Sequence, residues 1–211
     1  MGNSKLMKHW FVQNWVATTV ILASLAGCAS PSQPTRFYRL DGGETAAVMV
    51  DLKPRPGVVQ LGVSPVVLAG YLDRPQIVER HSRHRLELYE FDQWAGSLQE
   101  NLQSVVSERL QQQLKRVQVI AYPWPQSLNP QFELNLSISR FDRAGDKVVL
   151  QALWSLVERR SNQILEMQKV TLQEPFSGGD IEAGIEAANE AVNRLSENMA
   201  SQIRRSVTKP E

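Results

Sequence analysis

The sequence predicts an α+β fold, a two-layer domain in which two amphipathic helices cover a mainly antiparallel or mixed sheet. Short apolar segments with strand-like alternation dominate the chain after residue 37, and two longer segments carry apolar residues at helical spacing. Three of the strand-like segments follow one another with only turns between them. A chain of 211 residues with 42% hydrophobic and 21% charged residues suits one such domain.

The first strands are short. We expect them at residues 37–40 (FYRL), 58–68 (VVQLGVSPVVL, with a proline at an end or edge), 76–80 (QIVER) and 84–91 (HRLELYEF). Residues 41–57 contain several glycines and prolines, which predicts weak order there.

The first helix is expected over residues 92–115. Its apolar stripe consists of Trp94, Leu98, Leu102, Val105, Leu110 and Leu114. Asp92 is the expected N-cap, and Lys115 and Arg116 suit the negative end of the helix dipole.

One further strand and an antiparallel meander precede the second helix. The strand is expected at residues 117–122, and the meander at 132–141, 148–158 and 164–174. The last helix, residues 180–206, starts at the capping residue Asp180 and ends at Arg204 and Arg205. Its apolar stripe either packs on the sheet of the same chain, which we favour, or forms a seam between subunits.

The N-terminus has the layout of a bacterial export signal, predicted over residues 1–27. Lys5 and Lys8 precede a short apolar segment, and no acidic residue occurs there. The segment ends in LAGC, residues 25–28, which resembles the lipobox of bacterial lipoproteins. Cys28 is the only cysteine of the chain, so we expect it to carry a diacylglyceryl group and, after cleavage, an N-acyl group. The alternative is an ordinary secretory signal that leaves a free thiol.

Residues 28–36 form the expected lipidated N-terminus and a short tether. Ala29 follows the cysteine where an aspartate signals retention in the inner membrane of enterobacterial-type lipoproteins, so we expect sorting to the outer membrane, facing the periplasm. The tether reaches at most about 29 Å, which keeps the folded body close to the membrane surface.

The folded body, residues 37–206, resembles the PqiC/YmbA family of ABC-type transport auxiliary lipoproteins. The resemblance lies in FYRL, GVSPVVLAGYLDRPQIVER, FDQWAGSLQENL and VIAYPWP. The chain departs from the family at Ala69-Gly70, where a proline is expected before the Tyr-Leu pair.

The resemblance implies a non-catalytic docking subunit at the outer membrane. Members of the family work with a periplasmic MCE-domain protein (PqiB-like) and its membrane permease partner, in systems that move lipids between membranes or maintain envelope integrity. A homo-oligomeric ring is one expected arrangement. The alternative is a structural envelope lipoprotein that binds peptidoglycan or an outer-membrane assembly machine.

The residues themselves also argue against an enzyme. No nucleophile elbow, P-loop or HExxH motif occurs. His81 and His84 lie among arginines, which would repel a metal cation, so we expect no metal and no cofactor beyond the acyl groups on Cys28. This HSRHR stretch is either a basic patch acting with Arg74 or, as we favour, a solvated charged edge. The net charge of +1 and the lack of a basic run predict no nucleic-acid partner.

Three residues are the candidates for partner binding: Tyr71, Arg74 and Trp124. A tyrosine and an arginine in an ordered turn, and a tryptophan between two prolines, are typical interface anchors. The structural alternative places Tyr71 and Leu72 in the core and pairs Asp73 with Arg74.

Overall fold

The computed structural model describes residues 33–43, 53, 55–125 and 127–207. The chain forms two compact units, Met1–Pro34 and Thr35–Glu211, and the second holds every described helix and strand. The predicted signal peptide, Cys28 and Ala29 lie outside the described residues, as does most of the stretch 41–57.

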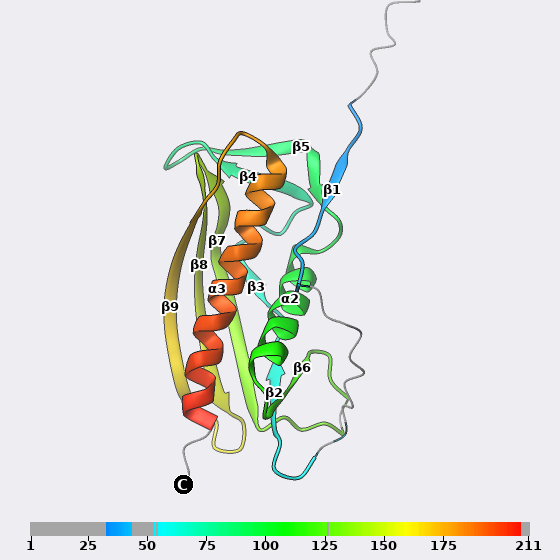
Figure 1. Cartoon of the computed structure of the whole chain (residues 1–211), viewed down its shortest axis with the longest axis vertical. Coiled ribbons are helices and arrows are strands. Elements are labelled where there is room, and N and C mark those ends of the chain that lie inside the picture. Colours follow the sequence, from blue (N-terminus) through cyan, green and yellow to red (C-terminus); the bar gives the residue numbers. More distant parts are fainter. Residues whose placement is uncertain (1–32, 44–52, 54, 126, 208–211) are drawn as a thin grey trace, which may run out of the picture. The chain divides into compact units, whose positions relative to one another are not determined.

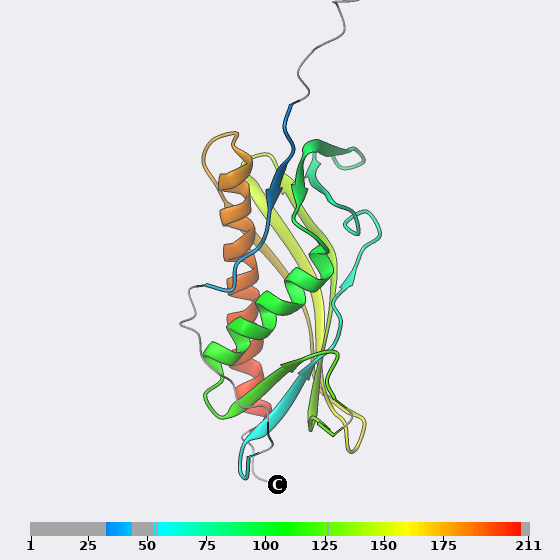
Figure 2. The ribbon, with the colours of Figure 1, turned by 90° about the vertical axis from the view of Figure 1, so that its right-hand side faces the viewer.

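A nine-stranded sheet forms one layer of the second unit, and two helices form the other (Figures 1 and 2). The strands are β1 (Arg36–Tyr38), β2 (Val59–Val63), β3 (Val67–Leu68), β4 (Gln76–Arg80), β5 (Leu86–Trp94), β6 (Val117–Ala121), β7 (Phe132–Ala144), β8 (Lys147–Glu158) and β9 (Gln163–Pro175). The helices are α2 (Leu98–Gln113) and α3 (Ile181–Val207). Both helices cover the same face of the sheet, so the predicted two-layer α+β class is confirmed.

The long strand β7 organises the sheet. On one side it pairs antiparallel with β8, which pairs antiparallel with β9. On its other side β2, β3 and β4 pair with it one after another along its length, all in parallel. β6 extends the sheet beyond β2, while β5 and then β1 extend it beyond β4. The sheet is therefore mixed, which the sequence allowed.

The meander β7–β8–β9 forms where the alternation predicts it. In β8 the inward-facing Val148, Leu150, Ala152, Trp154 and Leu156 are all buried in the core. The alternation buries one face of these strands under α3 and leaves the other face without a helix, because side chains point to opposite faces in turn.

The first helix is shorter than predicted. Residues 92–94 belong to β5, and α2 begins only at Leu98, with Ser97 as its N-cap. The Ser97 side chain accepts a hydrogen bond from the backbone N–H of Glu100 at 3.3 Å. The expected cap, Asp92, is wrong, and Lys115 and Arg116 lie beyond the helix end. The predicted apolar stripe from Leu98 onward is buried as expected, as is Trp94, although Trp94 is buried from a strand.

The segment 58–68 is two strands rather than one. Pro65 lies between β2 and β3, and a proline cannot donate to the ladder with β7, so pairing is interrupted there. The last helix matches its prediction. The carboxylate of Asp180 accepts a hydrogen bond from the N–H of Glu182 at 3.3 Å, and the whole apolar stripe of α3 is buried within the same domain.

The leading segment, residues 36–41, fastens the start of the domain to the sheet and to both helices. β1 pairs in parallel with the end of β5, and Arg36 forms an ion pair with Asp92 at 2.7 Å. Leu40 is 0% exposed, and the Asn101 side chain of α2 hydrogen-bonds to both its N–H (2.7 Å) and its carbonyl (3.1 Å). The chain that precedes Thr35 therefore joins a firmly held segment.

Candidate partner-binding surface

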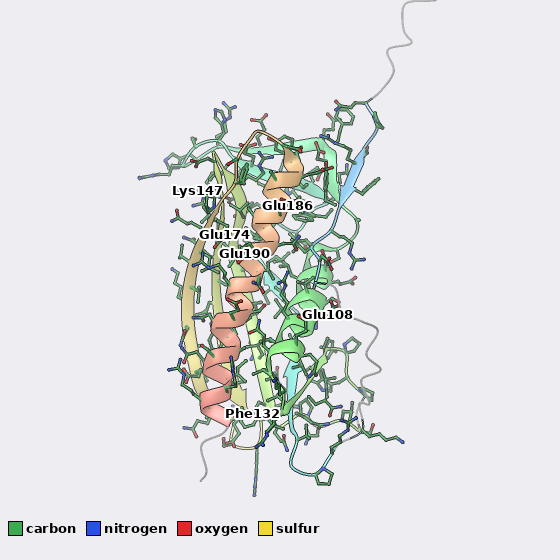
Figure 3. The ribbon with its side chains drawn as sticks, in the orientation of Figure 1. Glu108, Phe132, Lys147, Glu174, Glu186 and Glu190 are labelled. Atoms are coloured by element: carbon green, nitrogen blue, oxygen red, sulfur yellow. The ribbon has the colours of Figure 1, made fainter. Side chains whose placement is uncertain are left out.

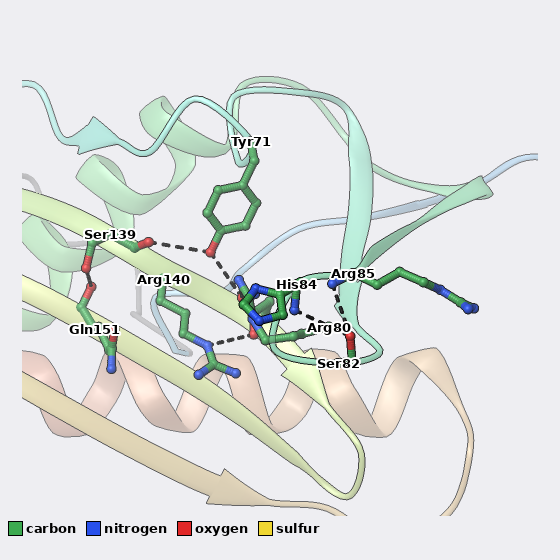
Figure 4. A network of polar contacts seen from close by, with 9 residues as sticks. Tyr71, Arg80, Ser82, His84, Arg85, Ser139, Arg140 and Gln151 are labelled. Atoms are coloured by element: carbon green, nitrogen blue, oxygen red, sulfur yellow. Dashed lines mark hydrogen bonds and ion pairs between the residues drawn. The ribbon is translucent and has the colours of Figure 1, made fainter.

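Tyr71 lies in the loop between β3 and β4 and is bound into a polar network on β7 (Figure 4). Its hydroxyl donates to Oδ2 of the buried Asp142 at 3.0 Å. Arg80 donates to the same oxygen through Nε (3.1 Å) and Nη2 (3.0 Å), and Arg140 Nε donates to Oδ1 at 2.9 Å. Two arginines and a tyrosine thus satisfy a carboxylate that would be costly to bury alone.

This network limits what Tyr71 can offer a partner. Burial, followed by the nearby Asp142 carboxylate, raises the pKa of Tyr71, so its hydroxyl stays protonated and keeps donating at neutral pH. The ring is half-buried, and the following Leu72 is in the core. The structure therefore supports the alternative in which these two residues pack inward.

Arg74 is also half-buried and is held by the turn. Its backbone N–H donates to the carbonyl of Leu72 at 2.9 Å, while its side-chain Nε is buried with no hydrogen-bond partner among the described residues. Asp73 is exposed, and the described residues show no ion pair between Asp73 and Arg74. The expected pairing of these two residues is therefore wrong.

Trp124 packs on the sheet beside an exposed aromatic residue. Its ring covers Gly62 of β2, where an added Cβ would lie 3.0 Å from Cη2. Tyr122, which is 50% exposed, meets the Trp124 ring edge-on at 5.3 Å between centroids, and the Arg159 guanidinium lies 5.8 Å from the centroid. Trp124 is half-buried, so this cluster presents aromatic surface next to a cation.

The three candidate residues do not form one surface. Arg159, the neighbour of Trp124, is hydrogen-bonded to Gln131 just before β7, whereas Tyr71 binds Asp142 near the far end of β7. The two places are separated by about 35 Å of extended strand. A partner that contacts Tyr71 and Arg74 would therefore need a second, distant contact to reach Trp124.

The HSRHR stretch forms the tip of the β4–β5 hairpin. Residues 81–85 are all exposed, and the Ser82 hydroxyl accepts from the N–H of Arg85 at 3.2 Å. Arg80, which directly precedes this stretch, is bound to Asp142. The described residues contain no group of three or more potential metal-ligating side chains.

The fold gathers basic residues that are scattered in the sequence at one end of the domain. We call this surface the basic end; its exposed members are Arg55, Lys115, Arg116, Arg159, Arg160, Arg204 and Arg205. They come from the approach to β2, the α2–β6 turn, the β8–β9 turn and the last turn of α3, all of which lie at the lower end of the domain in Figure 1. Backbone contacts confirm the clustering, since Val59 donates to the carbonyl of Arg116 and Arg159 donates to that of Gln131. Sequence reasoning missed this surface because no single segment carries more than two of its charges.

Two members of the basic end, Arg159 and Arg160, line a hollow of about 550 Å³. Arg159, Arg160 and Glu158 line it together with Asn129, Pro130, Gln131, Val59, Phe132 and Val207. Figure 3 shows Phe132 at this end of the domain, whereas Glu186 and Glu190 lie along α3 toward the other end. A hollow of this size with polar and apolar walls suits recognition of a side chain or short segment of another molecule.

Comparisons with known proteins agree with this fold. The family model described as "ABC-type transport auxiliary lipoprotein component" matches residues 38–200. The chain therefore belongs to the family of ABC-type transport auxiliary lipoprotein components, and the predicted resemblance is confirmed. The family's description, an auxiliary lipoprotein component of a transport system, implies a place in the cell envelope.

Two solved structures share the fold. An uncharacterized protein is 19% identical with a TM-score of 0.67, and the match covers 81% of this chain and 99% of that one. A Xanthomonas campestris protein of the DUF330 family model is 16% identical with a TM-score of 0.64, covering 82% of this chain and all of that one (100%). No curated protein matches the chain. Within the part of the chain that the structure describes, no helix has both the length and the apolar character needed to cross a membrane.

Proposed function

We propose that the protein is an outer-membrane lipoprotein, anchored through acyl groups on Cys28, that serves as a non-catalytic docking subunit of an MCE-type intermembrane lipid transport system. The observation that carries the proposal is the family match over residues 38–200, which begins ten residues after a lipobox cysteine. Ala29 supports sorting to the outer membrane, and the periplasmic MCE-domain protein with its permease is the partner that the family resemblance implies.

The way the domain starts also supports a docking role. The leading segment is bound to β5, α2 and α3, so the fold is held directly at the end of the tether. A subunit on a tether that reaches at most about 29 Å works by contact near its anchor. The described surface offers such contacts in the Tyr122–Trp124 cluster and in the basic end.

Co-purification tests the proposal. The full-length lipoprotein, extracted in detergent from outer membranes, should retain the MCE-domain protein through affinity purification and size-exclusion chromatography. The Cys28→Ser variant is the localisation control, since it should lose the outer membrane but keep the folded domain. Sedimentation with purified peptidoglycan is the competing measurement, and binding to peptidoglycan without any MCE partner would favour the structural envelope role instead.

A further inference from the structure

We propose that the basic end binds an acidic segment of a partner protein, with the hollow receiving one of its side chains. The inference rests on the proposed docking function and names the surface and the chemistry of the contact. Of the three candidate residues Tyr71, Arg74 and Trp124, it keeps only Trp124.

The exposed basic residues of this surface outnumber the acidic residues that the structure describes near it. Its seven basic residues are exposed and come from four separate segments. Among the described residues, the acidic neighbours are Glu133, Glu158 and Glu166, which accept hydrogen bonds from Ser64, Ser161 and Ser206, respectively, and keep their negative charge. Glu133 also forms an ion pair with Arg159 at 3.4 Å. A positive potential therefore extends over this end and favours encounter with a negatively charged surface.

The hollow gives this surface a specific shape in addition to its charge. Arg159 is fixed, because it donates to Asn129 Oδ1 at 3.0 Å and pairs with Glu133, whereas Arg160 beside it is exposed. Val59, Phe132 and Val207 supply apolar walls, and Asn129 and Gln131 supply amide groups. An extended segment that alternates carboxylate and apolar side chains would match both kinds of wall, with a carboxylate at Arg160.

The aromatic cluster borders the same surface. Arg159 lies against the Trp124 ring, and the half-exposed Tyr122 packs edge-on against that ring. Rigid aromatic residues beside arginines are the usual hot spots of protein interfaces. Trp124 therefore belongs to the proposed surface, while Tyr71 and Arg74 do not.

The position of the basic end favours a protein, rather than the anchoring membrane, as its binding partner. β1 begins at the end of the domain where α3 begins (Figure 1). The basic end lies at the other end of α3, about 40 Å away for a helix of this length. The chain ahead of Thr35 therefore joins the domain at the end opposite the basic end.

The test is a binding measurement with matched charge reversals in the full-length lipoprotein in detergent. The basic-end variant carries Arg116→Glu, Arg160→Glu and Arg205→Glu. The control variant carries Arg83→Glu, Arg85→Glu and Lys169→Glu, which change the net charge equally at exposed positions elsewhere. The probe is the purified MCE-domain protein, with Kd measured by biolayer interferometry at low and high salt. We expect the basic-end variant to bind at least about tenfold more weakly, the control to stay within about threefold, and the wild-type affinity to fall with salt.

Each other outcome contradicts the inference in a distinguishable way. Equal weakening by both variants would show that net charge, not this surface, matters. Unchanged binding by the basic-end variant would overturn the inference and leave the docking function standing, whereas no binding by the wild-type protein would overturn both. Flotation with vesicles of phosphatidylethanolamine and phosphatidylglycerol is the last arm: selective loss of vesicle binding by the basic-end variant, with partner binding intact, would assign the surface to lipid instead.

Discussion

Gly62 allows an aromatic side chain to lie directly on the sheet. A Cβ added there would lie 2.9 Å from Pro130 Cγ and 3.0 Å from Trp124 Cη2, both closer than ordinary contact. Gly62→Ala should therefore displace Trp124 and lower the free energy of unfolding by about 1–3 kcal/mol. Urea unfolding measures this change, and Gly70→Ala is the matched control because nothing lies within 4 Å of its added Cβ. Equal stability of the two variants would mean that Trp124 moves aside without cost.

Tyr89 makes stability depend on alkaline pH. Burial, followed by the hydrogen bond to Glu79, raises the pKa of Tyr89 from 10.0 to about 12. Because the folded-state pKa is the higher one, this contribution is complete below the unfolded pKa of 10.0 and is lost as the pH rises to about 12. We expect the wild-type protein to lose more unfolding free energy than Tyr89→Phe between about pH 9 and pH 11. Urea titrations at the two pH values test this, and parallel losses would contradict it.

The burial of single residues could be predicted better than the identity of the residues that contact them. Trp94 was expected in the core and is 8% exposed, because both helical and strand spacing place it inward. The network around Asp142 could not be predicted, since Tyr71 and Arg80 reach it across 71 and 62 positions of sequence. A buried aspartate in an alternating strand was the available signal, because such a group needs partners from elsewhere in the fold.

Among the elements, the strands of the meander are predictable and the β5–α2 boundary is not. Alternation over β7 and β8 matches only a strand with one buried face. Residues 94, 98 and 102 fit helical spacing equally well whether or not the helix includes Trp94. Gly96, with φ of +126°, ends the strand, and Ser97 then starts the helix.

Ser97 provides a test of this corrected boundary. Ser97→Ala removes the side-chain acceptor for the Glu100 N–H and should lower the free energy of unfolding by about 1 kcal/mol. Ser97→Asp keeps an acceptor at the cap and should restore most of the stability. Thermal unfolding followed by circular dichroism distinguishes the two variants, and identical melting curves would show that Ser97 does not cap α2.

At the scale of the whole molecule, the sequence predicts the layers but not the surface charge. The net charge of +1 gives no sign of the basic end. Each contributing turn carries only one or two of the basic residues, and these turns come together only after folding. The parallel pairing of β2, β3 and β4 along β7 brings these turns together, since it places the approach to β2 next to the β8–β9 turn.

Lipidation is a prediction about the whole chain. Cys28→Ser should abolish labelling by a fatty-acid precursor, because no other thiol exists to accept the diacylglyceryl group. Ala29→Asp should keep the label and shift the protein toward the inner membrane in density-gradient fractionation. Labelling that persists in Cys28→Ser would refute the lipoprotein assignment of this chain.

The boundary of the folded unit gives a second whole-chain prediction. A chain starting at Ser30 should fold with the same Tm as the mature protein, because the second unit starts at Thr35. A chain starting at Asp41 lacks β1 and the buried Leu40, and should melt several degrees lower. Equal Tm values for both truncations would show that the leading segment adds nothing to stability.

The pairing of β1 with β5 also determines how the domain responds to mechanical force. A pull on the chain ahead of Thr35 along the axis of β1 slides this strand past β5, so that its ladder bonds and the Arg36–Asp92 ion pair resist together rather than opening one at a time. Behind them, the two hydrogen bonds between Asn101 and Leu40 transmit the load to α2. Tension between a membrane anchor and a bound partner would thus be carried by shear at this strand while the core of the domain stays closed.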